Sequence, residues 1–161
     1  MSRQLSYAGG WTQVATGLGA VLGTIVSALM GDRLGRRITY AMQCAASLGV
    51  ALLFFLGNSH FNLQFLACAF LAGGVTASFY GWLPLYLPEL FPTKVRAVGQ
   101  GFAFNFGRIM SGAGSLYIGA IISTQFKNEY PVALSWLSSI YLLGLVAIWF
   151  APETKGQPLP E

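Results

Sequence analysis

Arg108 is the residue with the clearest chemical potential, because it is an arginine inside a long apolar run. If a membrane-spanning helix begins near Val98, Arg108 lies about ten residues, or roughly 15 Å, into that helix. An arginine at this depth costs about 2.5–3.5 kcal/mol even on the lenient insertion scale, so it should face a water-filled cavity or a counter-charge. Its planar guanidinium could bind a substrate carboxylate through two hydrogen bonds. Alternatively, a helix that begins earlier, near Lys94, would leave an arginine that snorkels toward the cytoplasmic end.

Three further residues are candidates for the same site. Asn105 and Ser111 lie about one turn to either side of Arg108 on a similar helix face, so they could extend its polar lining. Gln13, near the start of the first apolar run, could bind substrate or could lie at the membrane surface. Substrate binding and a position at the membrane surface therefore remain alternative roles for Gln13.

A cluster of charges separates the first two apolar runs. The segment Asp32-Arg33-Leu34-Gly35-Arg36-Arg37 contains three of the nine basic residues of the chain. Basic loops stay on the cytoplasmic side of a membrane, so this loop is predicted to be cytoplasmic. By alternation the loops that hold Lys94, Arg96 and Lys155 are cytoplasmic too. The amino terminus is then outside and the carboxyl terminus inside.

These residues require membrane-spanning helices to position them. The chain is 55% hydrophobic and 9% charged, whereas a soluble domain carries about 25% charged residues. Five runs have the length of a membrane-spanning helix, and no run alternates as a barrel strand would. We therefore predict an all-α membrane protein. Its expected parts are an extracytoplasmic lead-in at 1–13, spans at 14–30, 38–56, 61–83, 98–123 and 132–151, and a cytoplasmic tail at 152–161.

Glycines in two of these runs predict close helix packing. The run at 98–123 contains six glycines and the run at 14–30 contains three, and small residues let neighbouring helices approach closely.

Several functional classes find no support in the sequence. His60 has no second His, Cys or carboxylate spaced to join it, so no metal site is predicted. Cys44 and Cys68 lie inside apolar runs and are expected to be buried hydrophobic residues. No catalytic constellation or cofactor motif is present. Nucleic-acid binding is not expected either, because the basic residues lie in loops between apolar runs. No carboxylate lies inside a predicted span, so a proton-coupling carboxylate would lie elsewhere.

Three motifs together resemble the major facilitator superfamily. The loop at 32–37 resembles its D-R-x-G-R-R motif. The segment 88–96 resembles the P-E-x-F-P-T-x-x-R sequence that follows its tenth helix. The segment 152–156 is similar to the P-E-T-K-G tail after the twelfth helix of sugar-porter-like members. Gly99-Gln100-Gly101 and Phe104-Asn105-Phe106-Gly107-Arg108 look most like metabolite:proton symporters for organic acids and sialic acid.

The resemblance implies a fold and a gate. The five spans would be helices eight to twelve of a twelve-helix transporter, with the amino-terminal half as the missing partner. Arg36, Arg37, Glu89 and Arg96 would pair across the bundle and hold a cytoplasmic gate shut. Asp32 would cap a helix of the absent half.

The resemblance also implies a function. In sugar-porter relatives the third-run helix lines the substrate cavity, which would place Tyr80 there, although aromatic residues at a helix end usually anchor at the membrane surface. The expected function is transport of a small polar metabolite across the cell membrane by alternating access. The substrate would be an organic anion, such as an organic acid or a sialic-acid-like molecule, or a sugar. The alternative is a non-transporting membrane protein, either a truncated relic or a half-size partner subunit. No enzyme activity and no cofactor are expected.

Overall fold

The computed structural model describes residues 2–58, 60–126 and 129–161 of the chain. These residues form helices joined by short connections, and no strand occurs among them, which confirms the predicted all-α class. The elements are α1 (Ser2–Leu34), α2 (Arg36–Gly57), α3 (Leu63–Ala77), α4 (Phe79–Leu90), α5 (Arg96–Gln125), α6 (Tyr130–Leu137), α7 (Ile140–Ala147) and a 3₁₀ turn at Ile148–Phe150.

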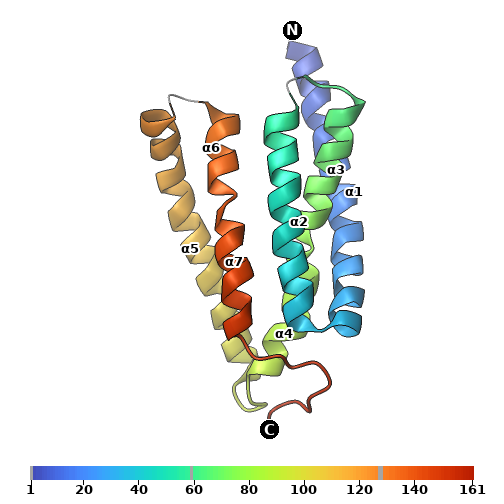
Figure 1. The fold of residues 1–161 in the computed structure, drawn as a ribbon, viewed down its shortest axis with the longest axis vertical. Helices are drawn as coiled ribbons and strands as arrows, with labels where there is room; N and C mark the ends of the chain where they lie inside the picture. Colours follow the sequence, from blue (N-terminus) through green and yellow to red (C-terminus); the bar gives the residue numbers. More distant parts are fainter. Residues whose placement is uncertain (1, 59, 127–128) are drawn as a thin grey trace.

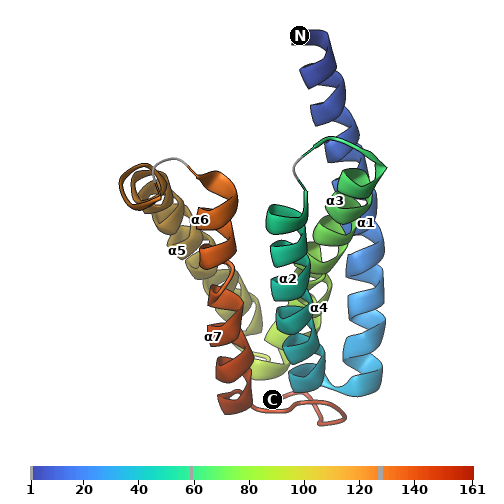
Figure 2. The ribbon, with the colours of Figure 1, turned by 45° about the horizontal axis from the view of Figure 1, so that its top comes forward.

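The helices run up and down, so that the charged segments meet at one end. The α1–α2 turn, the α4–α5 connection and the carboxyl-terminal tail lie at the same end of the molecule (Figure 1). The amino terminus, the end of α2, the start of α3 and the end of α5 lie at the opposite end. The first turns of α1 project beyond the other helices (Figure 2). This arrangement places the three motif-bearing segments next to one another.

Four helical stretches of the described residues are long and apolar enough to cross a membrane, namely 7–34, 36–57, 63–90 and 130–150. The predicted fourth span corresponds to α5, which has 30 residues but is not among them. Its sequence is rich in glycine and serine and contains Asn105 and Arg108. The lower hydropathy of α5 therefore follows from the residues that were predicted to line a cavity.

Two predicted boundaries differ from the observed ends of the helices. Residues 2–13 do not form a separate lead-in, because α1 is continuous from Ser2. The third pass does not end near Leu83 but continues through α4 to Leu90, with Pro84 and Pro88 inside the helix. Ser78 separates α3 from α4 within this pass, and its backbone N–H donates to the Gly74 carbonyl. The charged residue Glu89 is therefore part of a helix and not of a loop.

Close backbone packing joins α1 to the third pass. A Cβ atom built at Gly19 would lie 2.0 Å from the Phe70 carbonyl oxygen, and one at Gly23 would lie 1.9 Å from the Gly74 carbonyl oxygen. Real Cβ atoms never approach so closely, so glycine is required at both positions. By contrast, five of the six glycines at 98–123 have no atom within 4 Å of such a Cβ, and these are Gly101, Gly107, Gly112, Gly114 and Gly119. Within the described residues the glycine prediction therefore holds for Gly19 and Gly23 of α1, but not for Gly17 or for these five glycines of α5.

Candidate functional site

The charged cluster at the motif-bearing end is centred on Arg36, the first residue of α2. Its guanidinium donates through Nε to Glu89 Oε2 at 2.9 Å and through Nη2 to Glu89 Oε1 at 2.6 Å. Its Nη1 donates to Asp32 Oδ1 at 3.1 Å and to the Gly31 carbonyl at 2.6 Å. Only 8% of the Arg36 side chain is exposed, so these partners replace water around a nearly buried cation. The cluster ties α2 to α1 and to α4.

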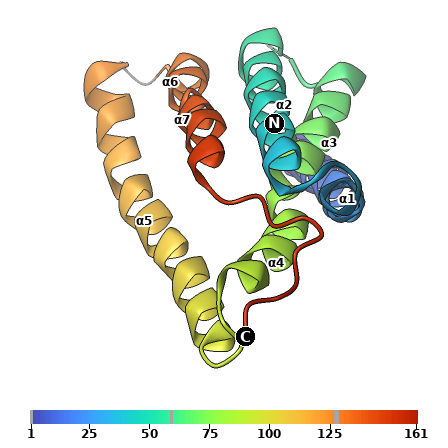
Figure 3. The ribbon, with the colours of Figure 1, turned by 60° about the horizontal axis from the view of Figure 1, so that its bottom comes forward.

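The tail supplies two members of the cluster that the sequence reasoning missed as site residues. Glu153 accepts the backbone N–H groups of Arg36 and Arg37, at 2.9 and 3.0 Å, and so caps the start of α2. Thr154 donates its hydroxyl to Glu89 Oε2 at 2.5 Å. Figure 3 shows the tail passing beneath α2 and α4 toward the start of α5. The P-E-T-K-G motif could have indicated the role of Glu153, because a helix amino terminus attracts a carboxylate.

The environment of Glu153 favours its charged form. Burial alone would raise its pKa, but the backbone N–H groups of Arg37, Arg36, Lys155 and Thr154 donate to the carboxylate. Together these donors hold the pKa of Glu153 below its usual value. The carboxylate is therefore ionised at neutral pH and complements the positive end of α2.

A tight turn allows this approach. Gly35 has φ of +98°, in the region that favours glycine, and a Cβ there would lie 3.1 Å from Glu153 Oε2. Two buried aromatic side chains support the same corner. The Trp82 indole donates to the Arg36 carbonyl at 2.9 Å, and the Tyr86 hydroxyl donates to the Pro152 carbonyl at 2.9 Å.

Arg37 and Arg96 lie near the cluster but do not form the predicted ion pairs. Arg37 Nε donates to the Ala151 carbonyl at 2.6 Å. Arg96 donates to the carbonyls of Pro88 and Phe91 and, through Nη2, to the Pro160 carbonyl at 2.9 Å. In the part of the chain that the structure describes, ion pairs join Arg36 to Asp32 and to Glu89 and include neither of these arginines. Both arginines instead satisfy carbonyl groups where a helix ends or the tail turns.

Asp32 was expected to cap a helix of another half. It forms an ion pair with Arg36 one turn along the chain, and 64% of its side chain is exposed. Its contribution to the cluster is therefore screened by solvent.

A separate pocket lies between the third pass, α5 and α7. Its volume is about 650 Å³, and its lining includes Tyr80, Phe104, Arg108, Ser111 and Tyr141. The pocket thus brings together three of the five predicted substrate residues from two different helices. The lining thus combines one cation with aromatic rings and hydroxyl groups.

The other two predicted substrate residues are outside this pocket. Asn105 is not among the lining residues, and its amide donates to the Gly101 carbonyl at 2.8 Å on its own helix. Gln13 is exposed on α1 and is not among the lining residues either. Helical spacing predicts a shared face for Asn105 and Arg108, but the Asn105 side chain bonds to its own helix and does not line the pocket. For Gln13, the local sequence does not determine which way the side chain faces.

Arg108 lies near the middle of α5. The helix begins at Arg96, so Arg108 is roughly 18 Å from that end at about 1.5 Å per residue. Because α5 begins before Val98, Arg108 lies farther from the amino-terminal end of the helix than a start at Val98 would place it. The guanidinium carbon is 5.8 Å from the centre of the Phe104 ring, within cation–π range. Among the described residues no carboxylate lies within ion-pair distance of Arg108.

Metal binding finds no support in the described residues, in which no group of three or more His, Cys, Asp or Glu side chains could hold an ion. Cys44 is buried, and Cys68 is partly buried.

Comparison with known proteins gives a consistent result. A family model described as "Sugar (and other) transporter" matches residues 1–161. A metabolite transport protein of Haemophilus influenzae is 30% identical over 99% of this chain and 39% of its own length. The cis,cis-muconate transport protein of Acinetobacter baylyi is 34% identical over 90% of this chain and 34% of its own length. The synaptic vesicle 2-related protein of Bos taurus is 33% identical over 86% of this chain and 24% of its own length. The chain thus spans well under half the length of these relatives.

Proposed function

The chain belongs to the sugar (and other) transporter family, and from this premise we propose that it helps to carry a small organic anion across the cell membrane by alternating access. In this proposal the chain provides helices eight to twelve of a twelve-helix transporter, with the amino-terminal half as its partner. Its carboxyl terminus is cytoplasmic. The family is one of transporters, which agrees with the expectation that the chain is not an enzyme.

The observation that carries the substrate proposal is the pocket around Arg108. One guanidinium lines a space of about 650 Å³ and has no carboxylate partner in the described part of the chain. A carboxylate bound there would receive charge-assisted hydrogen bonds, while the aromatic rings would contact the rest of the molecule. The related Acinetobacter protein is named for muconate, a dicarboxylate, which supports the same substrate class.

The charged cluster around Arg36 supports the gating part of the proposal. It links the ends of α1, α2 and α4 with the tail through bonds that lie at one end of the bundle. Such a network can hold that end closed, and a tilt of α4 relative to α2 would break the Arg36–Glu89 bond. In this scheme the pocket opens to the cytoplasm when the cluster separates. The pocket lining contains no Asp or Glu, so a symport proton would bind outside these residues.

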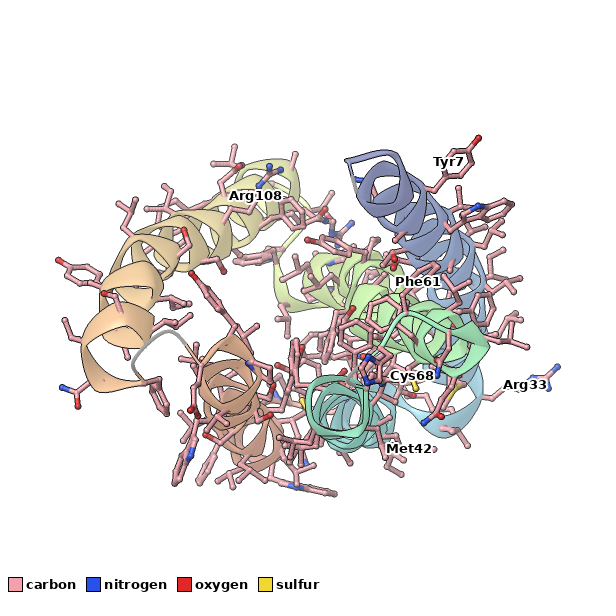
Figure 4. All side chains as sticks on the ribbon, turned by 90° about the horizontal axis from the view of Figure 1, so that it is seen from above. Tyr7, Arg33, Met42, Phe61, Cys68 and Arg108 are labelled. Carbon is pink, nitrogen blue, oxygen red and sulfur yellow. The ribbon has the colours of Figure 1, made fainter. Side chains whose placement is uncertain are left out.

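The test is equilibrium binding of radiolabelled cis,cis-muconate to the reconstituted transporter. Arg108→Lys keeps the charge and loses the planar fork, so it should weaken binding. Arg108→Gln removes the charge-assisted contact and should raise Kd about ten- to a hundredfold. Arg33→Gln is the matched control, because Arg33 points away from the bundle on the other side of the molecule (Figure 4).

The outcomes separate the possible roles of Arg108. Unchanged affinity in Arg108→Gln, with normal helical content, would show that Arg108 does not bind the anion. Tight binding of uncharged glucose that is insensitive to Arg108 would favour a sugar as the substrate.

A further inference from the structure

A second groove lies between α1, α2 and α3, on the side of the bundle away from Arg108. It has a volume of about 300 Å³. Met42 at its mouth lies across the molecule from Arg108 (Figure 4). Leu22, Val26, Met42 and Leu71 line the groove, and about half of each side chain is exposed. The groove is therefore separate from the proposed transport pocket, and an apolar molecule in the surrounding lipid could reach it.

Polar side chains lie among the lining residues of this otherwise apolar groove. Gln43 and Ser27 line it from α2 and α1, and they are 5% and 2% exposed. The Gln43 amide donates to Ser27 Oγ and, at 3.5 Å, to the carbonyl of Ser78, which also lines the groove. The side-chain nitrogen of Gln43 is thus satisfied by neighbouring helices.

The other half of the Gln43 amide is not satisfied. Its Oε1 atom is buried and has no hydrogen-bond donor among the described residues. A buried acceptor without a donor is costly, and the cost is relieved when a donor reaches it. An apolar molecule with one hydrogen-bond donor would therefore bind in this groove more tightly than an apolar molecule without a donor.

We propose that this groove binds a small apolar molecule with a single hydroxyl or N–H donor, which contacts Gln43. The size of the groove sets the size of the ligand. A protein cavity of about 150 Å³ holds benzene, so about 300 Å³ has room for roughly two rings. Leu22, Val26 and Met42 contact the apolar body. The Gln43 amide oxygen accepts the donor at the floor.

The probes are 2-naphthol and naphthalene, which share two fused rings and differ by one hydroxyl group. Binding to the full chain in phosphatidylcholine nanodiscs is measured by equilibrium dialysis, with empty nanodiscs as the blank. We expect saturable binding of 2-naphthol about tenfold tighter than that of naphthalene, the effect of one added hydrogen bond to a buried acceptor. Absence of saturable 2-naphthol binding, or equal affinity for both probes, would overturn the proposal.

Three variants locate the site. Gln43→Leu removes the acceptor and should reduce the 2-naphthol preference to near unity while naphthalene still binds. Ala46→Phe fills the groove from α2 and should abolish binding of both probes, because Ala46 is one of its lining residues. Ala45→Phe is the matched control, an exposed neighbour on the same helix that does not line the groove. If Ala45→Phe blocks binding as well as Ala46→Phe, or Gln43→Leu keeps the preference, the assignment to this groove is wrong.

Discussion

Removal of one charge from the Arg36–Glu89 pair should destabilise the chain strongly. Glu89→Gln keeps the shape of the side chain but leaves Arg36 with Asp32 and the Gly31 carbonyl as partners. Removing one partner of a fully buried pair costs about 3–5 kcal/mol. Here the Glu89 side chain is 17% exposed and Asp32 retains part of the attraction. We therefore expect a loss of about 2–3 kcal/mol in the free energy of unfolding.

A double-mutant cycle isolates the pair from its surroundings. Arg36→Gln and Glu89→Gln, alone and combined, should give a coupling energy of about 2 kcal/mol, because either single variant breaks the charge-assisted bidentate pair. Unfolding is followed by tryptophan fluorescence during titration of detergent micelles with dodecyl sulfate. Trp82 reports on this corner directly, since its indole donates to the Arg36 carbonyl.

The control for this cycle is Glu129→Gln. Glu129 is exposed, so its substitution should change stability by less than about 0.5 kcal/mol and should add independently to Arg36→Gln. A coupling energy near zero between Arg36 and Glu89 would refute the reasoning. It would mean that the tail and backbone contacts, and not the ion pair, hold this end of the bundle together.

Three further predictions follow from other parts of the molecule. Gly23→Ala should lower the free energy of unfolding, measured by thermal unfolding, by about 1–3 kcal/mol or more, because the added Cβ would meet a carbonyl of α3 at 1.9 Å. Gly17→Ala is the control, because a Cβ there has open space and the substitution should be neutral or stabilising. The pKa of Glu153 is lowered in the folded chain, so attachment of the tail should be complete above pH about 4.5 and weaken as pH falls through the lowered pKa. Spin-label mobility at Gln157→Cys should report this release, and Glu153→Gln should remove its pH dependence. In a chain without its two native cysteines, an impermeant maleimide should label Gly57→Cys from outside and Gln157→Cys only after permeabilisation, and outside labelling at 157 would reverse the proposed orientation.

The helical passes were predictable because hydropathy and length are local properties of the sequence. The apolar runs correctly indicate α1, α2 and the pass formed by α6 and α7. Their ends were less predictable, since Pro84 and Pro88 read as the end of a helix but lie inside α4. Neighbouring helices can satisfy the backbone groups that a proline frees, and that depends on packing and not on local sequence.

The candidate site was predictable in type and only partly in membership. The resemblance grouped Arg36 with Glu89, between which the structure has an ion pair, but it assigned Asp32 to a helix of the missing half. It could not show that Arg96 satisfies carbonyl groups, because its partners include Pro160, 64 residues away. Glycine spacing likewise predicted close approach in α1 and α5 alike, but among the described residues only Gly19 and Gly23, both in α1, meet the backbone of a neighbouring helix. Which face of a helix meets another is set by tertiary packing.

The position of Glu153 has a consequence for the order in which the chain is made. The carboxylate that caps α2 lies 117 residues after the amide of Arg36 that it accepts, so α2 is synthesised long before its cap. Until the tail emerges from the ribosome, the start of α2 lacks that partner and Glu89 lacks the hydroxyl of Thr154. Bringing together groups so distant in sequence costs loop-closure entropy, which slows folding. The charged end therefore cannot complete its contacts until Glu153 and Thr154 have been translated, after every helix that the structure describes.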